Sequence, residues 1–259
     1  MISVPVEPFL VWLMVFIRTG FMFGFFPLFG DGFVLMRVRV LMAAVVALAL
    51  TPVVPLGAES FPQTTLGMIM MVGSEAMLGF AIGLVGKIMF GIVQFSGQIA
   101  GEQMGFGLIN TLDPSAMHQI SVVAEMQYIL AVLVFLVADF HHLVIKVLSA
   151  SFRILSPGQA MSNPGVLEYF LRLGETMFEL SLQFAMPVVI VIFSVNIGMA
   201  MIGRAVPQVN IFLESFPIRI ISGLIVLTAS LGFLVRLWIK MFEDLGYSLG
   251  ELLNLFAGV

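Results

Sequence analysis

Hydrophobic and polar positions divide the chain into long apolar segments separated by short polar breaks. Proline, glycine and asparagine mark most of the breaks, which is typical of turns. The apolar segments cover residues 9–29, 40–56, 66–95, 122–138, 177–202 and 218–238. A helix needs about 20 apolar residues to cross the hydrocarbon core of a bilayer. Each segment is near or above that length, so the pattern predicts six membrane-spanning helices.

The pattern changes after Met241. Apolar residues recur there at helical spacing and face polar ones, which predicts a short amphipathic helix over residues 242–259. The apolar positions are Leu245, Leu249, Leu252 and Phe256, and the polar ones are Asp244, Ser248, Glu251 and Asn254. The acidic face argues against adsorption to anionic lipid. We therefore expect this helix to pack against a protein partner.

The composition places the chain among integral membrane proteins. Of its 259 residues, 60% are hydrophobic and only 10% are charged, with a mean hydropathy of +1.12. Soluble domains carry about 25% charged residues. The net charge of −4 argues against a nucleic-acid surface. The chain has no cysteine, which excludes disulfides, thiolate metal sites and cysteine nucleophiles.

A polar, glycine-rich insert interrupts the apolar pattern at residues 97–107. It reads GQIAGEQMGFG and continues to Asn110, Asp113 and Pro114. Lipid cannot satisfy backbone or polar groups, so such a segment at membrane depth must be buried in protein or line a cavity. The insert thus indicates that something passes through or past the protein.

Small residues recur at spacings of four around this insert. They are Gly79 and Gly83, followed by Gly97, Gly101 and Gly105. This spacing places them on one helix face and lets a second helix approach closely. Packing within the chain is the favoured interpretation, and packing between subunits around a pore is the alternative.

Charged residues also occur inside the apolar segments. They are Arg18, Glu75, Lys87 and Glu125. Charge at membrane depth is costly and usually faces a partner or a cavity. Glu75 and Lys87 lie about 18 Å apart on a straight helix and cannot pair with each other, whereas Lys87 could pair with Glu125. Structural pairing is favoured over a proton or ion path.

We find no catalytic or metal-binding constellation in the sequence. The chain lacks a G-x-S-x-G elbow, an H-E-x-x-H motif and a phosphate-binding loop. His141 and His142 are adjacent and would point about 100° apart on a helix, so one ion is not naturally held by both. We expect no metal, no cofactor and no enzyme activity. An intramembrane hydrolase using either histidine as a base stays an alternative, as does a stand-alone secondary transporter with a solute site near the midplane.

The break between the last two apolar segments is a polar turn. It contains Pro207, Gln208 and Asn210, and Pro217 is predicted to open the following helix. Arg204 and Glu214 add charge to an otherwise apolar hairpin. The turn is either a simple hairpin tip or a contact with a partner.

Two of these stretches resemble the FliR family. The first is residues 97–114, with Gly101, Gln103-Met104-Gly105 and Asp113-Pro114. The second is residues 204–212, reading RAVPQVNIF, followed by Phe216-Pro217. The order of the apolar segments agrees as well, so the resemblance covers nearly the whole chain. SctT is the counterpart of this family in virulence secretion systems.

The resemblance implies a non-enzymatic subunit of the flagellar type III secretion export gate. Such a subunit assembles with FliP-like and FliQ-like subunits into a conduit for unfolded flagellar proteins, and FlhB and FlhA associate with it. The location implied is the bacterial inner membrane, at the flagellar basal body. A homologue from a virulence system is the alternative.

The resemblance also implies an all-α fold with long, kinked helices. Residues 1–175 would form a FliP-like part, residues 176–241 a FliQ-like helical hairpin and residues 242–259 the amphipathic C-terminal helix, within one structural unit overall.

In this family a loop after the Q-M-G stretch protrudes into the conduit and helps to plug it. Here that loop maps to about residues 105–117. Glycines permit unusual backbone conformations, and apolar side chains can dewet a constriction. The plug residues would be Gly105, Phe106, Gly107, Leu108, Ile109, Asn110, Thr111, Leu112, Asp113 and Pro114.

Two further sets of site residues follow from these stretches. Helix packing or a subunit interface is expected at Gly79, Gly83, Gly97, Gly101, Gln103 and Met104. A hairpin tip that contacts partners is expected at Arg204, Pro207, Gln208, Asn210, Phe212, Phe216 and Pro217.

Overall fold

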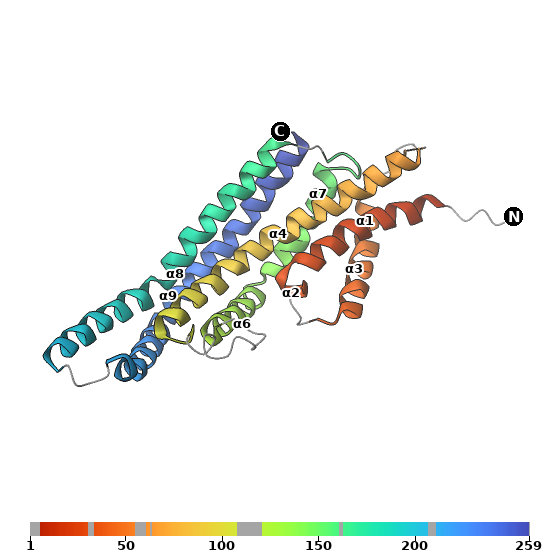
Figure 1. Cartoon of the computed structure of the whole chain (residues 1–259). Helices are drawn as coiled ribbons and strands as arrows, with labels where there is room; N and C mark the ends of the chain where they lie inside the picture. Colours follow the sequence, from red (N-terminus) through yellow and green to blue (C-terminus); the bar gives the residue numbers. More distant parts are fainter. Residues whose placement is uncertain are drawn as a thin grey trace. The chain divides into compact units, whose positions relative to one another are not determined.

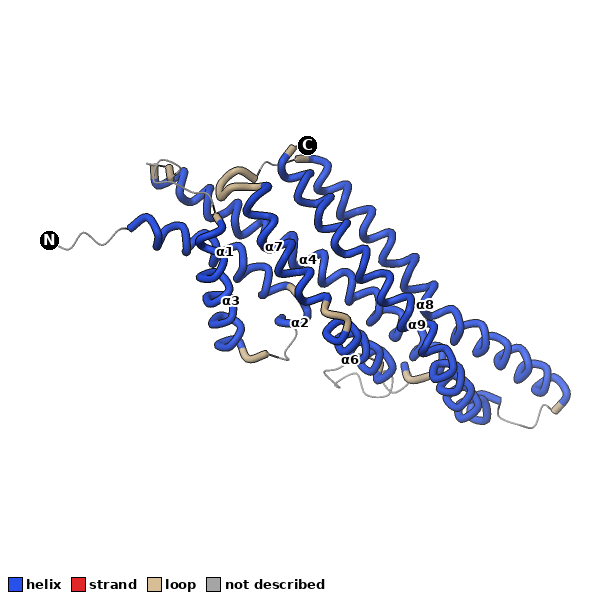
Figure 2. Tube along the Cα trace, turned by 180° about the vertical axis from the view of Figure 1, so that it is seen from behind, coloured by secondary structure: helices blue, strands red, loops and turns tan. Residues whose placement is uncertain are grey.

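The protein is helical throughout the residues that the structure describes. The computed structural model describes residues 6–30, 34–54, 61–62, 64–107, 121–160, 163–206 and 211–258. Within these ranges the chain forms helices and turns, and no strand occurs (Figures 1 and 2). The prediction of an all-α fold is confirmed.

The helices differ greatly in length. They are α1 (Val6–Phe25), α2 (Pro27–Gly30), α3 (Met36–Leu50), α4 (Thr65–Met104), α6 (Val122–Val137), α7 (Phe140–Ile154), α8 (Pro164–Ala205) and α9 (Ile211–Ala257), with a short 3₁₀ turn at Thr51–Val53. α4, α8 and α9 have 40, 42 and 47 residues. At 1.5 Å per residue, their lengths measured along the helix axis are about 60–70 Å, roughly twice the hydrocarbon thickness of a bilayer.

The apolar segments of the sequence overlap α1, α3, α4, α6, α8 and α9, but some helix boundaries differ from the prediction. α9 runs without interruption from Ile211 to Ala257, so the amphipathic residues at the C-terminus are its last part and not a separate helix. Pro217 lies inside α9, and the prediction that it opens this helix is wrong. α7 is an element that the apolar pattern does not predict.

Five helices are long and apolar enough to cross a membrane among the described residues. They are α1, α3, α4, α8 and α9, and a sixth span results if α6 and α7 are counted together. A chain with this many apolar helices is a multi-pass membrane protein.

The described helices form two compact units. Unit 1 contains residues 1–89, 139–173 and 242–259, and unit 2 contains residues 90–138 and 174–241. The boundaries at 173/174 and 241/242 lie close to those of the predicted hairpin, residues 176–241. The likeness of the parts to FliP and FliQ stays a prediction.

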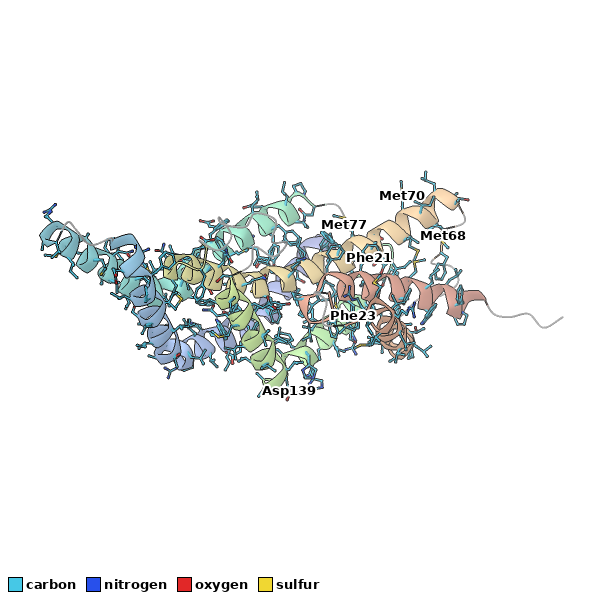
Figure 3. All side chains as sticks on the ribbon, turned by 60° about the horizontal axis from the view of Figure 1, so that its bottom comes forward. Phe21, Phe23, Met68, Met70, Met77 and Asp139 are labelled. Atoms are coloured by element: carbon cyan, nitrogen blue, oxygen red, sulfur yellow. The ribbon has the colours of Figure 1, made fainter. Side chains whose placement is uncertain are left out.

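In unit 1, α1 packs directly on the first half of α4 (Figure 1). A side chain at Gly79 would overlap the carbonyl oxygen of Arg18, and one at Gly83 would come within 2.8 Å of the carbonyl oxygen of Met22. The two helices therefore touch backbone to backbone, as small residues at spacings of four allow. Their outer faces carry exposed apolar side chains, among them Phe21 and Met70 (Figure 3). Such faces suit lipid or protein rather than water.

The C-terminal part of α9 packs against the first part of α8 and against α7, all within unit 1. The hydroxyl of Tyr169 donates a hydrogen bond of 2.8 Å to the carbonyl of Ser248, and the rings of Phe140 and Phe242 lie 5.7 Å apart. The apolar positions of the C-terminal pattern are fully buried: Leu245, Leu249, Leu252 and Phe256. The face that we expected to need a protein partner is covered by the chain itself.

In unit 2, the second half of α4 packs against α6 and α8. Phe90 on α4 contacts Tyr128 and Phe135 on α6, with ring centroids 6.0 and 5.2 Å apart. The hydroxyl of Ser181 on α8 donates to the carbonyl of Ile92 at 3.0 Å. Further along α4, after this core, comes its glycine-rich end, where the candidate site lies.

Candidate functional site

α4 ends in a capping motif that the sequence insert encodes. The amide of Gly105 donates to the carbonyl of Glu102, and the amide of Phe106 donates to the carbonyl of Gly101, both at 3.0 Å. This pair of bonds is a Schellman motif, which needs a left-handed residue after the helix. Gly105 supplies it with a φ of 97°. The Q-M-G stretch therefore stops the helix at a defined residue.

α6 begins beside the same turn of α4. Ser121 caps α6, because its hydroxyl accepts a hydrogen bond from the amide of Val123. The backbone amide of Ser121 donates to the side-chain oxygen of Gln98 on α4 at 2.9 Å. A side chain at Gly101 would overlap the hydroxyl of Ser121, and one at Gly97 would come within 2.5 Å of Ala124. The glycines thus let the start of α6 lie directly on α4.

We call Gln98, Gly101, Gly105 and Ser121 the loop base. The chain leaves α4 at Gly105 and re-enters described structure at Ser121, next to Gly101. Both ends of the intervening stretch are therefore held at one place. Gly105, Phe106 and Gly107 belong to the described residues, whereas the other predicted plug residues, 108–114, lie outside them.

Two sequence motifs that are far apart in the chain meet at this end of α4. The ring of Phe216 on α9 lies 2.9 Å from where a side chain on Gly105 would begin. Met104 is buried, and its side chain lies within 2.6 Å of the corresponding position on Gly223. The start of α9, which follows the polar turn, therefore packs against the end of α4. The sequence alone did not predict this contact.

The remaining residues of the predicted hairpin tip are only partly described. Arg204 and Pro217 have exposed side chains, and so does Gln103 of the packing set. Pro207, Gln208 and Asn210 lie outside the described residues, as does the side chain of Phe212. Their expected contact with partners stays a prediction.

Unit 1 contains a buried ion pair that the sequence analysis did not foresee. The guanidinium of Arg18 on α1 binds the carboxylate of Glu75 on α4 through two hydrogen bonds of 2.8 and 3.0 Å, and both side chains are 0% exposed. Arg18 also donates to the hydroxyl of Ser151 and the carbonyl of Leu155, each at 3.1 Å. Its guanidinium carbon lies 4.1 Å from the ring centroid of Phe152. A paired charge that also forms several hydrogen bonds is tolerated at membrane depth.

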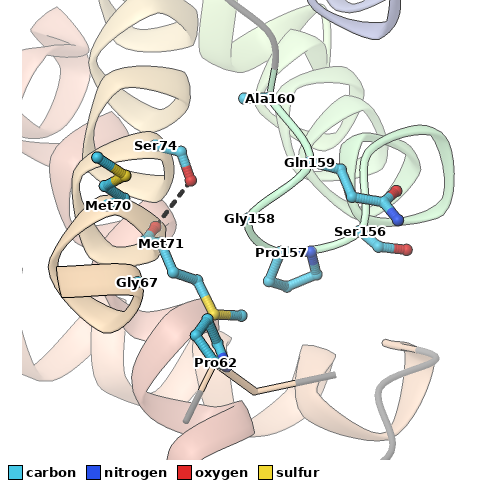
Figure 4. Close-up of a pocket in the computed structure, with 10 residues that line it drawn as sticks. All are labelled: Pro62, Gly67, Met70, Met71, Ser74, Ser156, Pro157, Gly158, Gln159 and Ala160. Atoms are coloured by element: carbon cyan, nitrogen blue, oxygen red, sulfur yellow. Dashed lines mark hydrogen bonds between the residues drawn. The ribbon is translucent and has the colours of Figure 1, made fainter. Parts of the chain in front are cut away.

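We call Arg18, Glu75, Ser151 and Phe152 the charge cluster. The segment that follows α7 closes over it, since the amide of Gly158 donates to the carboxylate of Glu75 at 3.1 Å. Beside this contact lies a cavity of about 620 Å³ between that segment and α4 (Figure 4). None of its described lining residues has a titratable side chain, so the cavity offers shape and not acid–base chemistry.

Lys87 and Glu125 do not join this cluster. Both side chains are exposed, and neither forms an ion pair within its own unit in the described part of the chain. They belong to different units, so the predicted pairing of Lys87 with Glu125 stays a prediction.

Sequence reasoning missed residues whose roles depend on a distant neighbour. Arg18 and Glu75 were recognised as charges of opposite sign in apolar segments, and that sign was the signal for their pairing. Gln98 and Ser121 carried no comparable signal, because a capping role appears only when α6 returns to α4.

A different cluster, Asp139 with His141 and His142, brings possible metal ligands within 4.8 Å of one another.

Comparison with known proteins identifies the family. A model of the family described as bacterial export proteins, family 1, matches residues 9–245. The chain is 30% identical to the flagellar biosynthetic protein FliR of Bacillus subtilis over 227 residues, which cover 86% of each protein. It is 24% identical to the protein of the same name from Escherichia coli over 258 residues, covering 98% of each. A third relative, from Pectobacterium carotovorum, is 28% identical over 215 residues, covering 82% of this chain and 80% of that protein.

The matched region includes the whole charge cluster and the whole loop base, together with the helices that hold them. A match of this extent leaves no large part of the described structure outside the family. The chain therefore belongs to family 1 of the bacterial export proteins.

Proposed function

We propose that this chain is a non-enzymatic subunit of the flagellar type III export gate. With FliP-like and FliQ-like subunits it forms a conduit in the bacterial inner membrane, at the flagellar basal body, through which unfolded flagellar proteins pass. FlhA and FlhB associate with this core. Membership of the export family supports the proposal, and the three relatives named above are all called flagellar biosynthetic proteins. Their names favour the flagellar over the virulence system.

The loop base is the observation that carries the proposal. A Schellman motif at Gly105 and a capped helix start at Ser121 hold both ends of one stretch against α4. That stretch contains the predicted plug residues, of which Leu108, Ile109 and Leu112 are apolar. We infer that the apolar segment between these two ends dewets a narrow passage.

The burial of the long helices supports an assembly with other subunits. In the most apolar window of α4, 61% of the residues are buried within the chain, whereas the values for α8 and α9 are 22% and 17%. Most residues in the most apolar windows of α8 and α9 are therefore not buried within the chain. In a membrane, helices of this kind are covered by lipid or by other helices, and packing against FliP-like and FliQ-like chains would cover them.

Copurification tests the assembly. The full chain, expressed with FliP-like and FliQ-like proteins of the same organism and carrying the only affinity tag, should bring both proteins down in constant ratio. A stand-alone secondary transporter would purify alone or as a homo-oligomer. Purification without companions from cells that export flagellar proteins would refute the gate assignment.

Deletion of Phe106 to Thr111 tests the plug. Cells that express the assembled gate with this deletion should leak small ions, because the passage loses its apolar closure. Copurification of the variant with its companions serves as the control for assembly. Unchanged leakage in a correctly assembled complex would refute the plug while leaving membership of the gate intact.

A further inference from the structure

The turn between α6 and α7 gathers three possible metal ligands. Asp139 lies at this turn (Figure 3), and His141 and His142 follow in the first turn of α7. One carboxylate oxygen of Asp139 lies 3.9 Å from Nε2 of His141 and 3.4 Å from Nδ1 of His142. The three ligand atoms all lie within 4.8 Å of one another.

These separations suit a single small cation. Zinc bonds of about 2.0–2.2 Å in tetrahedral geometry place neighbouring ligand atoms about 3.3–3.6 Å apart. The distance from Asp139 to His142 already lies in that range, and the distance from Asp139 to His141 needs a shift of a few tenths of an ångström. The two imidazole nitrogens lie within 4.8 Å of each other and must approach by at most about 1.5 Å. Adjacent residues on a helix point about 100° apart, and for this reason the sequence did not predict an ion shared by the two histidines. In the structure they converge because one offers Nε2 and the other Nδ1 toward the same carboxylate.

The backbone at Asp139 keeps the carboxylate available as a ligand. Asp139 precedes α7 at the N-cap position, yet its side chain makes no capping hydrogen bond. Its φ of 59° is the only left-handed value of a non-glycine residue in the described part of the chain. Aspartate tolerates this conformation better than most residues. The carboxylate faces the imidazoles instead of the helix, and its negative charge offsets the unfavourable field of the helix start on a cation.

We propose that Asp139, His141 and His142 bind a divalent transition-metal ion of the zinc class. Two imidazole nitrogens and one carboxylate oxygen are ligands that Zn²⁺ accepts, and the fourth position is open to water or to a ligand from another protein. The carboxylate is 73% exposed and the side chain of His142 is 61% exposed, so the ion has free access.

One of the two imidazoles lacks a supporting hydrogen bond among the described residues. Nδ1 of His141 is buried and has no hydrogen-bond partner among the described residues. Metal-bound histidines usually donate through their other nitrogen, and loss of that bond weakens metal affinity about 10–100-fold. We therefore expect binding that is specific but weaker than at a structural zinc site, with an ion that exchanges readily.

Zinc titration of the full chain tests the proposal. The protein is purified in detergent with a tag free of histidine, and Zn²⁺ is measured by competition with a chromophoric chelator. One ion should bind per chain, and Co²⁺ in its place should give the visible absorption of a tetrahedral site. His141→Ala and His142→Ala should each weaken binding at least tenfold.

Two further variants make the outcome decisive. Asp139→Gly removes the carboxylate while suiting the left-handed backbone, so it should fold and still lose at least tenfold in affinity. His118→Ala changes the remaining histidine of the chain and should leave the affinity unchanged within twofold. Far-ultraviolet circular dichroism checks that each variant is folded. Failure of the unmodified chain to bind one ion, undiminished binding by Asp139→Gly, or an equal loss in His118→Ala would overturn the assignment.

Discussion

Glycines let a neighbouring helix approach both halves of α4, but the two halves differ in how charge is used. In the first half, Glu75 is held by a bidentate ion pair to Arg18, and both charges are fully buried. In the second half, Gly97 and Gly101 carry no side chain, and the start of α6 lies against the bare backbone. Both halves fit closely at glycines; the first adds a buried ion pair, and the second adds the neutral hydrogen bond from Ser121 to Gln98.

An ion pair and a close contact at glycine differ in how easily they can be separated. A buried ion pair is costly to separate, because each charge would be left without a partner in a medium of low polarity. Contacts between glycines and small residues are individually weak and can be remade after a small shift. The charge cluster therefore fixes the scaffold of unit 1, whereas the close contacts between α4 and α6 at the loop base in unit 2 can adjust.

The largest effect is expected when one charge of the cluster is removed. Arg18→Met or Glu75→Gln should each lower the free energy of unfolding by about 3–5 kcal/mol, because the other charge stays buried and unpaired. The double variant Arg18→Met/Glu75→Met should recover most of that loss. Titration with denaturing detergent, followed by circular dichroism, measures the differences.

An exposed ion pair in the same unit provides the matched control. Arg172 and Glu251 lie 3.2 Å apart with side chains that are 59% and 53% exposed. Arg172→Met should therefore change the free energy of unfolding by less than about 1 kcal/mol. Equal losses at the buried and the exposed pair would show that the charge cluster is not the fixed point of unit 1.

Adding a side chain at Gly101 is expected to have the next largest effect. Gly101→Val would force the side chain into Ser121 and should lower the free energy of unfolding by about 1–3 kcal/mol. Gly73 lies on the same helix, and no atom lies within 4 Å of where its side chain would begin. Gly73→Ala should instead raise stability by up to about 1 kcal/mol, because alanine favours helix. Equal responses at the two glycines would contradict the close fit at the loop base.

A smaller loss is expected at the helix cap. Gly105→Ala should lower the free energy of unfolding by about 1–2 kcal/mol, because an alanine resists the φ of 97°. Adding Phe216→Ala should not restore the loss, since the strain lies in the backbone and not only in the neighbouring ring. Complete rescue by Phe216→Ala would show instead that crowding by the ring is the cause.

The smallest loss in this series is expected at the start of α6. Ser121→Ala removes the hydroxyl that caps the helix and should lower the free energy of unfolding by about 1 kcal/mol. Ser121→Gly needs no room beside Gly101 and should cost less than Ser121→Ala, because glycine is tolerated at the N-cap. Ser194→Ala, at an exposed serine inside α8, should stay within about 0.5 kcal/mol of the unmodified chain.

Local patterns in the sequence predict most of the fold. Runs of apolar residues locate the long helices, because hydropathy needs no knowledge of neighbours. α7 escaped prediction because His141, Lys146 and Arg153 interrupt its apolar positions, and only one face is buried, through Val144, Leu148 and Phe152. The length of α9 was not predicted either, because Pro217 suggested that a helix starts at that residue.

The sites were less predictable because they depend on distant contacts. The glycines at spacings of four indicated close packing, and the structure supplies their neighbours within the chain. The pairing of Arg18 with Glu75 required knowing that α1 lies on α4, and the role of Gln98 required knowing where α6 begins. The convergence of His141 and His142 depends on side-chain rotamers and on the backbone of Asp139, which no spacing rule reports.

Site-specific cross-linking to a stalled export substrate tests whether residues 108 and 109 line the conduit. The chain has no cysteine, so a single cysteine at Leu108 or Ile109 reports on that position alone. If the segment lines the conduit, it should form a disulfide with a cysteine in a flagellar protein trapped during export, whereas a cysteine at the exposed Leu133 of α6 should not. Cross-linking at Leu133 but not at Leu108 or Ile109, in gates that still export, would contradict the account.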